Sequence, residues 1–148
     1  MKHLVLTVGL LILAQPAFAQ TVVETDFVLT ITEADGSEIR ESTTLIPLLA
    51  GACYTWWLKL AKVKGEVEVS EAFTLPSAPD SWGTVNESTS ISDDMLTATT
   101  TMSLAADSDG WIGHGWCVAE GDPTGDHQIV VKSGDKVLGT FPFQIEKM

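Results

Sequence analysis

The sequence predicts an all-β fold, a two-sheet antiparallel sandwich of about seven or eight short strands. Three observations lead to this prediction. Several segments alternate apolar and polar residues with the period of two that a strand requires, turn-forming residues separate these segments, and no helical period competes with them after the N-terminal segment. Short antiparallel strands bury their apolar faces when two sheets pack face to face.

The first two strands are expected to form a hairpin. Residues 22–32 place Val23, Phe27, Leu29 and Ile31 on one face and mostly polar residues on the other. Asp35-Gly36 then suits a turn with positive φ, and residues 38–46 continue as the second strand.

The next two strands carry most of the predicted core. Residues 52–60 are aromatic and apolar and end before a turn at residues 62–65, so we expect a central strand. Residues 66–75 alternate again, and one face gathers Val67, Val69, Phe73 and Leu75. Glu71 falls on that apolar face and breaks the pattern.

The second half of the domain alternates loops and strands. Residues 76–83 and the polar stretch 86–94 are expected to be surface loops, and strands are expected at residues 95–104 and 111–118, the latter with glycines that allow close packing. Residues 127–133 and 136–146 form the last hairpin, whose second arm points four apolar side chains to one side: Val137, Phe141, Phe143 and Ile145.

Residues 1–19 have the features of a cleavable bacterial signal peptide. Lys2 gives a charged start, an apolar run follows, and Ala17-Phe18-Ala19 offers a small-x-small cleavage site. The apolar run is too short to span a bilayer, and Pro16 follows it. We therefore expect residues 20–148 to form a single β-sandwich domain that is periplasmic or secreted, without insertion in the membrane.

The charge of the chain limits its partners. The sequence has 20 acidic and 8 basic residues, and removal of Lys2 with the signal peptide leaves a net charge of −13. A negative field of this size repels phosphate backbones and anionic lipid head groups. We expect no nucleic-acid partner, whereas cations and basic partners are permitted.

Cys53 and Cys117 are the only cysteines, and both lie in predicted strands. In an oxidising compartment their pairing is expected. The bridge is expected to join the two sheets across the sandwich. A redox-active pair is disfavoured because the sequence has no Cys-x-x-Cys spacing.

The C-terminal stretch resembles the last hairpin of many bacterial immunoglobulin-like sandwich domains. The resemblance is carried by Glu120-Gly121-Asp122-Pro123-Thr124-Gly125, then Ile129, Val131, Gly134, Phe141 and Phe143. Together with Cys53-Tyr54-Thr55-Trp56 and Phe73-Thr74-Leu75-Pro76, these residues resemble an uncharacterised family of exported bacterial immunoglobulin-like β-sandwich domains. The resemblance implies that architecture and no activity. Gly115, where an antibody-like domain has a corner tyrosine, departs from the antibody pattern, as do Trp56 and Trp57 so close to Cys53.

Catalytic constellations are weak in this sequence. After the signal peptide only His114 and His127 can serve as a histidine base, and no Gly-x-Ser-x-Gly elbow is present. A carboxylate on an apolar face, such as Glu71, can act as a general acid, or it can pair with Lys59 or cap a backbone donor. We expect a non-enzymatic protein without a cofactor.

A metal site is the alternative function. Four residues near two predicted turns are its candidate ligands: His114, His127, Asp107 and Asp109. Imidazole nitrogen suits zinc or copper, and carboxylates suit calcium. This reading makes the chain a periplasmic metal-binding protein.

The leading hypothesis is an exported interaction module that contacts an envelope protein or a glycan. Exposed tryptophan stacks on sugars and anchors protein partners. Neighbours on a strand face opposite ways, so one of Trp56 and Trp57 points away from the core. The candidate binding surface consists of Trp56, Trp57, Trp82 and Trp111, and Trp82 lies in a proline-rich loop.

Overall fold

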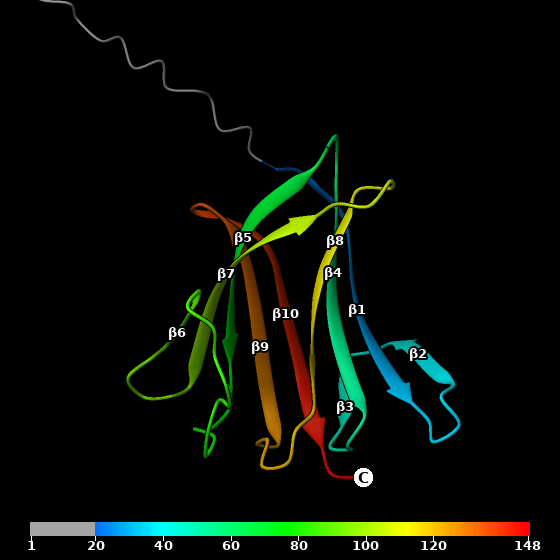
Figure 1. Cartoon of the computed structure of the whole chain (residues 1–148), viewed down its shortest axis with the longest axis vertical. Coiled ribbons are helices and arrows are strands. Elements are labelled where there is room, and N and C mark those ends of the chain that lie inside the picture. Colours follow the sequence, from blue (N-terminus) through cyan, green and yellow to red (C-terminus); the bar gives the residue numbers. More distant parts are fainter. Residues whose placement is uncertain (1–19) are drawn as a thin grey trace, which may run out of the picture.

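Ten β-strands form two sheets in the computed structural model, which describes residues 20–148 (Figure 1). The predicted signal peptide, residues 1–19, lies outside the described residues. The strands are β1 (Val22–Thr32), β2 (Glu38–Ser42), β3 (Leu45–Pro47), β4 (Ala52–Leu60), β5 (Glu66–Thr74), β6 (Thr89–Ile91), β7 (Thr97–Ala105), β8 (Trp111–Cys117), β9 (Gly125–Ser133) and β10 (Lys136–Glu146).

The predicted two-sheet sandwich is confirmed. One sheet has the strand order β2-β1-β4-β8 and the other has the order β3-β10-β9-β5-β7-β6. Strand pairing is antiparallel in both sheets apart from β3 and β10, which run parallel. In the part of the chain from residue 20 onward, no helix has the length and apolar character that a membrane span needs.

The structure has more strands than predicted because one expected strand is shared between the sheets. Residues 38–46 divide into β2 in the first sheet and β3 in the second. The amide of Thr43 still donates to the carbonyl of Phe27 at 3.1 Å, whereas the carbonyl of Thr44 accepts from the amide of Gln144 at 2.8 Å. The second additional strand is β6, which lies within a stretch predicted to be a loop. In β6 the hydroxyl of Thr89 is 2.8 Å from the hydroxyl of Thr100 on β7.

The core lies between the two sheets and follows the predicted alternation. Trp56 and Leu58 of β4 are fully buried, and Val131 and Phe141 of the opposite sheet are buried too. The ring centroids of Trp56 and Phe141 are 6.0 Å apart. Each such large side chain contributes about 1.5–3 kcal/mol when it leaves water.

Two residues predicted to face the core are exposed where the strand pairing is irregular. In β1 the register with β4 shifts between Val22 and Glu24, and Val23 is 58% exposed. In β10 the exposed residue is Val137, because this strand contains a bulge. The register with β9 shifts between Val137 and Gly139, which reverses the faces of the strand before this point. Leu138 is therefore buried, and Val137 is 50% exposed. The other three predicted core residues of this arm, Phe141, Phe143 and Ile145, are buried as expected.

Cys53 and Cys117 form the predicted disulfide, but the predicted position across the sandwich is wrong. The two residues are register partners on neighbouring strands β4 and β8 of one sheet, with their Cα atoms 3.9 Å apart. Ala52 and Tyr54 point into the core, so Cys53 between them points outward. The bridge therefore fastens β8, an edge strand, to its own sheet.

Candidate functional site

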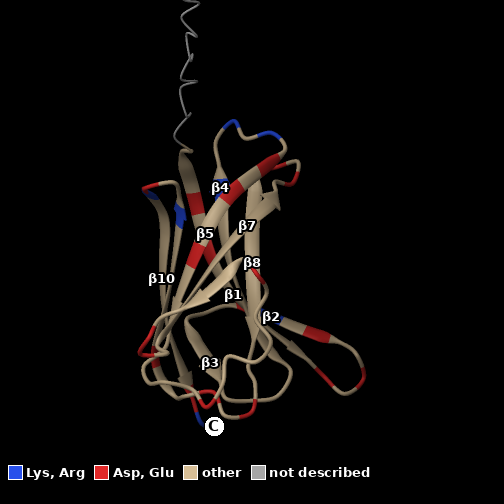
Figure 2. Cartoon of the chain, turned by 60° about the vertical axis from the view of Figure 1, so that its left-hand side comes forward, with Lys and Arg blue, Asp and Glu red and all other residues tan. Residues whose placement is uncertain are grey.

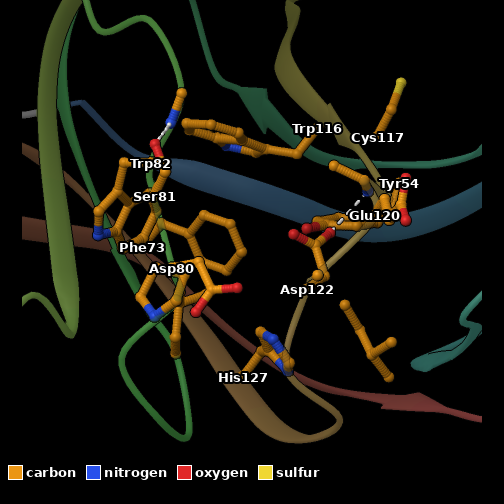
Figure 3. Close-up of a pocket in the computed structure, with 16 residues that line it drawn as sticks. Tyr54, Phe73, Asp80, Ser81, Trp82, Trp116, Cys117, Glu120, Asp122 and His127 are labelled. Atoms are coloured by element: carbon orange, nitrogen blue, oxygen red, sulfur yellow. Dashed lines mark hydrogen bonds between the residues drawn. The ribbon is translucent and has the colours of Figure 1, made fainter.

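A pocket of about 380 Å³ opens at one end of the sandwich (Figure 3). It lies where β5 and β8 end and β9 begins, between the loop that follows β5 and the loop that joins β8 to β9. Pro79 and Gly121 belong to these loops, and Ile145 of β10 lies at the base. Loops at the end of a rigid sandwich are the usual place for binding residues in this architecture.

Aromatic side chains form the pocket wall. Phe73 stands at its centre, with ring centroids 5.2 Å from Trp116, 5.8 Å from Trp82 and 6.3 Å from Tyr54. Figure 3 shows these rings turned toward one another from separate elements. The wall therefore takes its rings from both sheets, with Trp82 and Trp116 partly exposed and Phe73 and Tyr54 almost fully buried.

Hydrogen bonds hold the two tryptophan rings in place. The indole N–H of Trp82 donates to the carbonyl of Met95 at 2.9 Å. The indole N–H of Trp116 donates to Oε1 of Glu71 at 2.8 Å. Both indole N–H groups thus donate to acceptors within the protein, and the two rings offer the pocket their aromatic faces.

Three carboxylates lie around this wall: Asp80, Glu120 and Asp122. Asp122 accepts a hydrogen bond from the amide of Ala119 at 2.8 Å, which fixes the β8–β9 loop. Burial raises the pKa of the Tyr54 hydroxyl well above its usual value, and the negative charges of Asp122 and Glu71 raise it further. Tyr54 therefore stays neutral at physiological pH.

His127 completes the wall as a neutral imidazole. Its side chain is 3% exposed, and its ring stacks on Phe143 with centroids 5.1 Å apart. Burial lowers the pKa of His127 below its usual value, against the opposing influence of the Gly125 carbonyl and the charges of Asp122 and Asp126. Nδ1 donates to the Gly125 carbonyl at 2.9 Å, so Nε2 is an acceptor. Among the described residues, the buried Nε2 has no hydrogen-bond partner, which costs about 1–3 kcal/mol.

Glu71 is buried behind the pocket and joins the two sheets. It belongs to β5, and its carboxylate accepts hydrogen bonds from Trp56 of β4 and from His114 and Trp116 of β8. The His114 Nδ1 to Glu71 Oε2 distance is 3.0 Å. Neither sequence-based alternative for pairing, Lys59 or a backbone donor, describes this arrangement. Lys59 lies 3.9 Å from Glu24 instead.

The four tryptophans of the predicted binding surface lie in different places and do not form one surface. Trp82 lines the pocket, whereas Trp56 is 0% exposed and so cannot belong to a binding surface. Trp57 points outward and covers Gly113, where an added Cβ would come within 2.5 Å of its ring. Trp111 lies beneath Lys59, whose Nζ is 5.6 Å from the ring centroid.

The comparisons with known proteins agree with this architecture. The sequence model of the PM0630 β-sandwich domain family matches residues 25–146, most of the chain. This chain belongs to the PM0630 β-sandwich domain family. No curated protein matches its sequence.

Among solved structures, this PM0630 domain is similar to an immunoglobulin-like protein of Pseudomonas aeruginosa, PA1606. The identity is 12%, the TM-score is 0.54, and the match covers 89% of this chain and 100% of the other. The alkylpurine DNA glycosylase AlkC of Pseudomonas fluorescens matches at 10% identity with a TM-score of 0.34, over 83% of this chain and 30% of that one. The first likeness shows an immunoglobulin-like fold, as the sequence resemblance implied.

The predicted metal ligands of this PM0630 domain do not come together. His114 lies on β8 against Glu71, and His127 lies on β9 in the other sheet. Asp107 instead stabilises its own turn, because its Oδ1 accepts from the amides of Asp109 and Trp111, each at 2.9 Å. Within residues 20–148 no group of three or more His, Cys, Asp or Glu side chains is placed to hold a metal ion.

Sequence reasoning missed most of the pocket of this PM0630 domain. Tyr54, Phe73 and Trp116 were expected to belong to the core or went unassigned, because their alternation shows the face of each strand but not the end at which strands leave a cavity. A local signal was available. Glu120 and Asp122 flank Gly121 shortly after the strand that contains Trp116. Trp82 lies in a loop long enough to reach the end of that strand.

Proposed function

We propose that this chain is an exported binding module that holds an envelope polypeptide at its aromatic pocket and acts without catalysis. The observation that carries the proposal is the wall itself. It combines four aromatic rings and a buried histidine acceptor without a donor, at a loop end of a rigid sandwich. Large aromatic side chains that line a preformed cavity are typical of ligand and partner sites.

Hydrogen bonds at the pocket support binding rather than covalent chemistry. The hydroxyl of Ser81 accepts from the amide of Gly83 at 2.9 Å, and His127 bonds to the Gly125 carbonyl. A nucleophile needs a base within hydrogen-bond reach, and among the described residues Ser81 shares no hydrogen bond with the unpartnered Nε2 of His127. Glu71 is committed to three donors from the opposite sheet.

Site-specific photocrosslinking in cells tests the binding site. A photoreactive phenylalanine analogue at position 81 on the exposed pocket rim is compared with the same analogue at position 68, on the outer face of β5. We expect a polypeptide adduct at position 81, reduced by Trp82→Ala and retained in Trp111→Ala. Equal adducts at both positions, or adducts that survive Trp82→Ala, would argue against the pocket.

Export is tested separately by mass spectrometry of the native protein from the periplasmic fraction. We expect a first residue of Gln20 and a mass two hydrogens below that of the reduced chain, since Cys53 and Cys117 are bridged. A chain that begins at Met1, or one recovered with free thiols, would contradict an exported protein.

A further inference from the structure

The pocket offers hydrogen-bond acceptors in excess of donors. The indole N–H groups of Trp82 and Trp116 are already donated to Met95 and Glu71. The carboxylates of Asp80, Glu120 and Asp122 can only accept, and so can Nε2 of neutral His127. A ligand that satisfies this wall must bring N–H or O–H donors.

The charge of the pocket is also of one sign. Among residues 20–148 no lysine or arginine lines it, and His127 is neutral at pH 7 because burial lowers its pKa. Figure 2 shows basic residues, in blue, gathered at the far end of the sandwich, where the turn after β4 carries Lys62 and Lys64 and β10 begins with Lys136. Lys147 follows β10 at the pocket end but does not line the pocket. The field at the pocket therefore attracts cations.

We infer that the pocket binds an alkylammonium group, the end of a lysine side chain on the partner polypeptide. This inference rests on the proposed function. The aliphatic part of a lysine fits an apolar aromatic wall, and its ammonium carries three donors for the surrounding carboxylates. The faces of Trp82 and Trp116 add cation–π attraction, which is strongest for tryptophan.

Other ligand chemistries satisfy the wall less well. A quaternary ammonium would stack on the rings but leave the carboxylates without a donor. An anion would meet Asp80, Glu120 and Asp122 directly. A neutral sugar could stack on Trp82 and donate hydroxyls, but its binding would not depend on the three negative charges.

Small probes test the inference on the folded, oxidised protein. Nα-acetyl-lysine-N-methylamide represents a lysine in a polypeptide, and Nα-acetyl-norleucine-N-methylamide is its uncharged counterpart of similar shape. Nuclear magnetic resonance follows the indole N–H signals of Trp82 and Trp116 during titration. We expect the lysine probe to shift both signals saturably with one site, and the norleucine probe to bind about tenfold more weakly or worse.

Charge-removing variants locate the effect. Asp80→Asn with Glu120→Gln removes two exposed carboxylates of the pocket, and Glu68→Gln with Asp135→Asn removes the same charge from the outer face of β5 and the far turn. The pocket pair is expected to weaken the lysine probe about tenfold and leave the norleucine probe unchanged. The control pair is expected to change the affinity of either probe less than about twofold.

Each further outcome decides between the inference and the proposed function. Norleucine binding as tight as lysine binding, or loss of affinity only in the control pair, overturns the inference and leaves a neutral binding pocket. Tighter binding of free cadaverine shows that the ammonium comes from a small diamine. A response to N,N′-diacetylchitobiose alone indicates a glycan. If no probe shifts the indole signals, the lysine inference is wrong. A photocrosslinked adduct at position 81 would then still support the proposed polypeptide binding, whereas its absence would overturn the proposed function as well.

Discussion

Replacement of Glu71 by leucine should destabilise the sandwich by about 3 kcal/mol. The indole N–H of Trp56 is fully buried and bonds to Glu71, so Glu71→Leu leaves it without an acceptor, which costs about 1–3 kcal/mol. Trp116 and His114 are half-buried, and each loses a hydrogen bond that water replaces in part, at about 0.5–1 kcal/mol each.

Urea unfolding of the oxidised protein, followed by tryptophan fluorescence, measures this effect. With a slope of about 2 kcal/mol per molar urea, the midpoint should fall by about 1.5 M. Glu71→Gln should lower the free energy of unfolding by less than Glu71→Leu does, about 1–3 kcal/mol. The amide oxygen remains an acceptor, whereas the amide nitrogen faces a donor with which it cannot form a hydrogen bond. Glu68→Gln, on the outer face of the same strand, should stay within about 0.5 kcal/mol of the parent.

A second substitution separates the lost acceptor from other effects of the leucine. Trp56→Phe removes the buried donor, so Glu71→Leu should cost less in that background, with a coupling of about 1 kcal/mol or more. A Glu71→Leu midpoint within about 0.3 M of the parent would refute the reasoning. Such a result would mean that the free-energy cost of burying the Glu71 carboxylate equals the stabilisation from its three hydrogen bonds.

Three other expectations concern the disulfide, His127 and Gly113. Reduction, or replacement of Cys53 and Cys117 by alanine, should cost about 4 kcal/mol for a loop of 64 residues, measured by urea unfolding with and without reductant, and an unchanged midpoint would contradict this. The lowered pKa of His127 means that the unfolded chain binds the proton more readily, so the free energy of unfolding should fall as the pH drops from about 6.5 through the lowered pKa. His127→Phe should lose that part of the pH dependence, and a profile identical to that of the parent would exclude His127 as its source. Gly113→Ala should destabilise by about 1–3 kcal/mol because its Cβ would overlap the Trp57 ring, and Trp57→Ala should recover part of the loss in a double-mutant cycle.

Local alternation predicted the faces of the strands well where the pairing is regular. In β5 the inward residues Val67, Val69 and Phe73 are buried, as is Leu75 directly after the strand, and Glu71 lies inward with them, as its position in the pattern required. Val137 failed because the bulge in β10 comes from its pairing with β9, which the period of one strand does not contain. The faces of a strand are local information, whereas irregular pairing depends on its neighbour.

Long-range arrangement explains the other differences. Cys53 and Cys117 were assigned correctly to strands and to a bridge, but their position required knowledge that β4 and β8 are neighbours. The division of residues 38–46 between the sheets likewise depends on contacts with Phe27 and Gln144, far away in the sequence. The pocket combines both problems, since its wall takes residues from strands of both sheets and from two loops.

The termini of the described chain lie at opposite ends of the sandwich (Figure 1). β1 leaves one end and pairs with β4 from Val22 to Ile31, and β10 runs to the other end beside β9. Antiparallel hydrogen bonds lie perpendicular to their strands, so a force applied between the termini acts across them in shear. Many bonds along β1 then carry the tension together instead of opening one after another. Pulled lengthwise, the domain should resist extension far better than a hairpin unzipped from its open end.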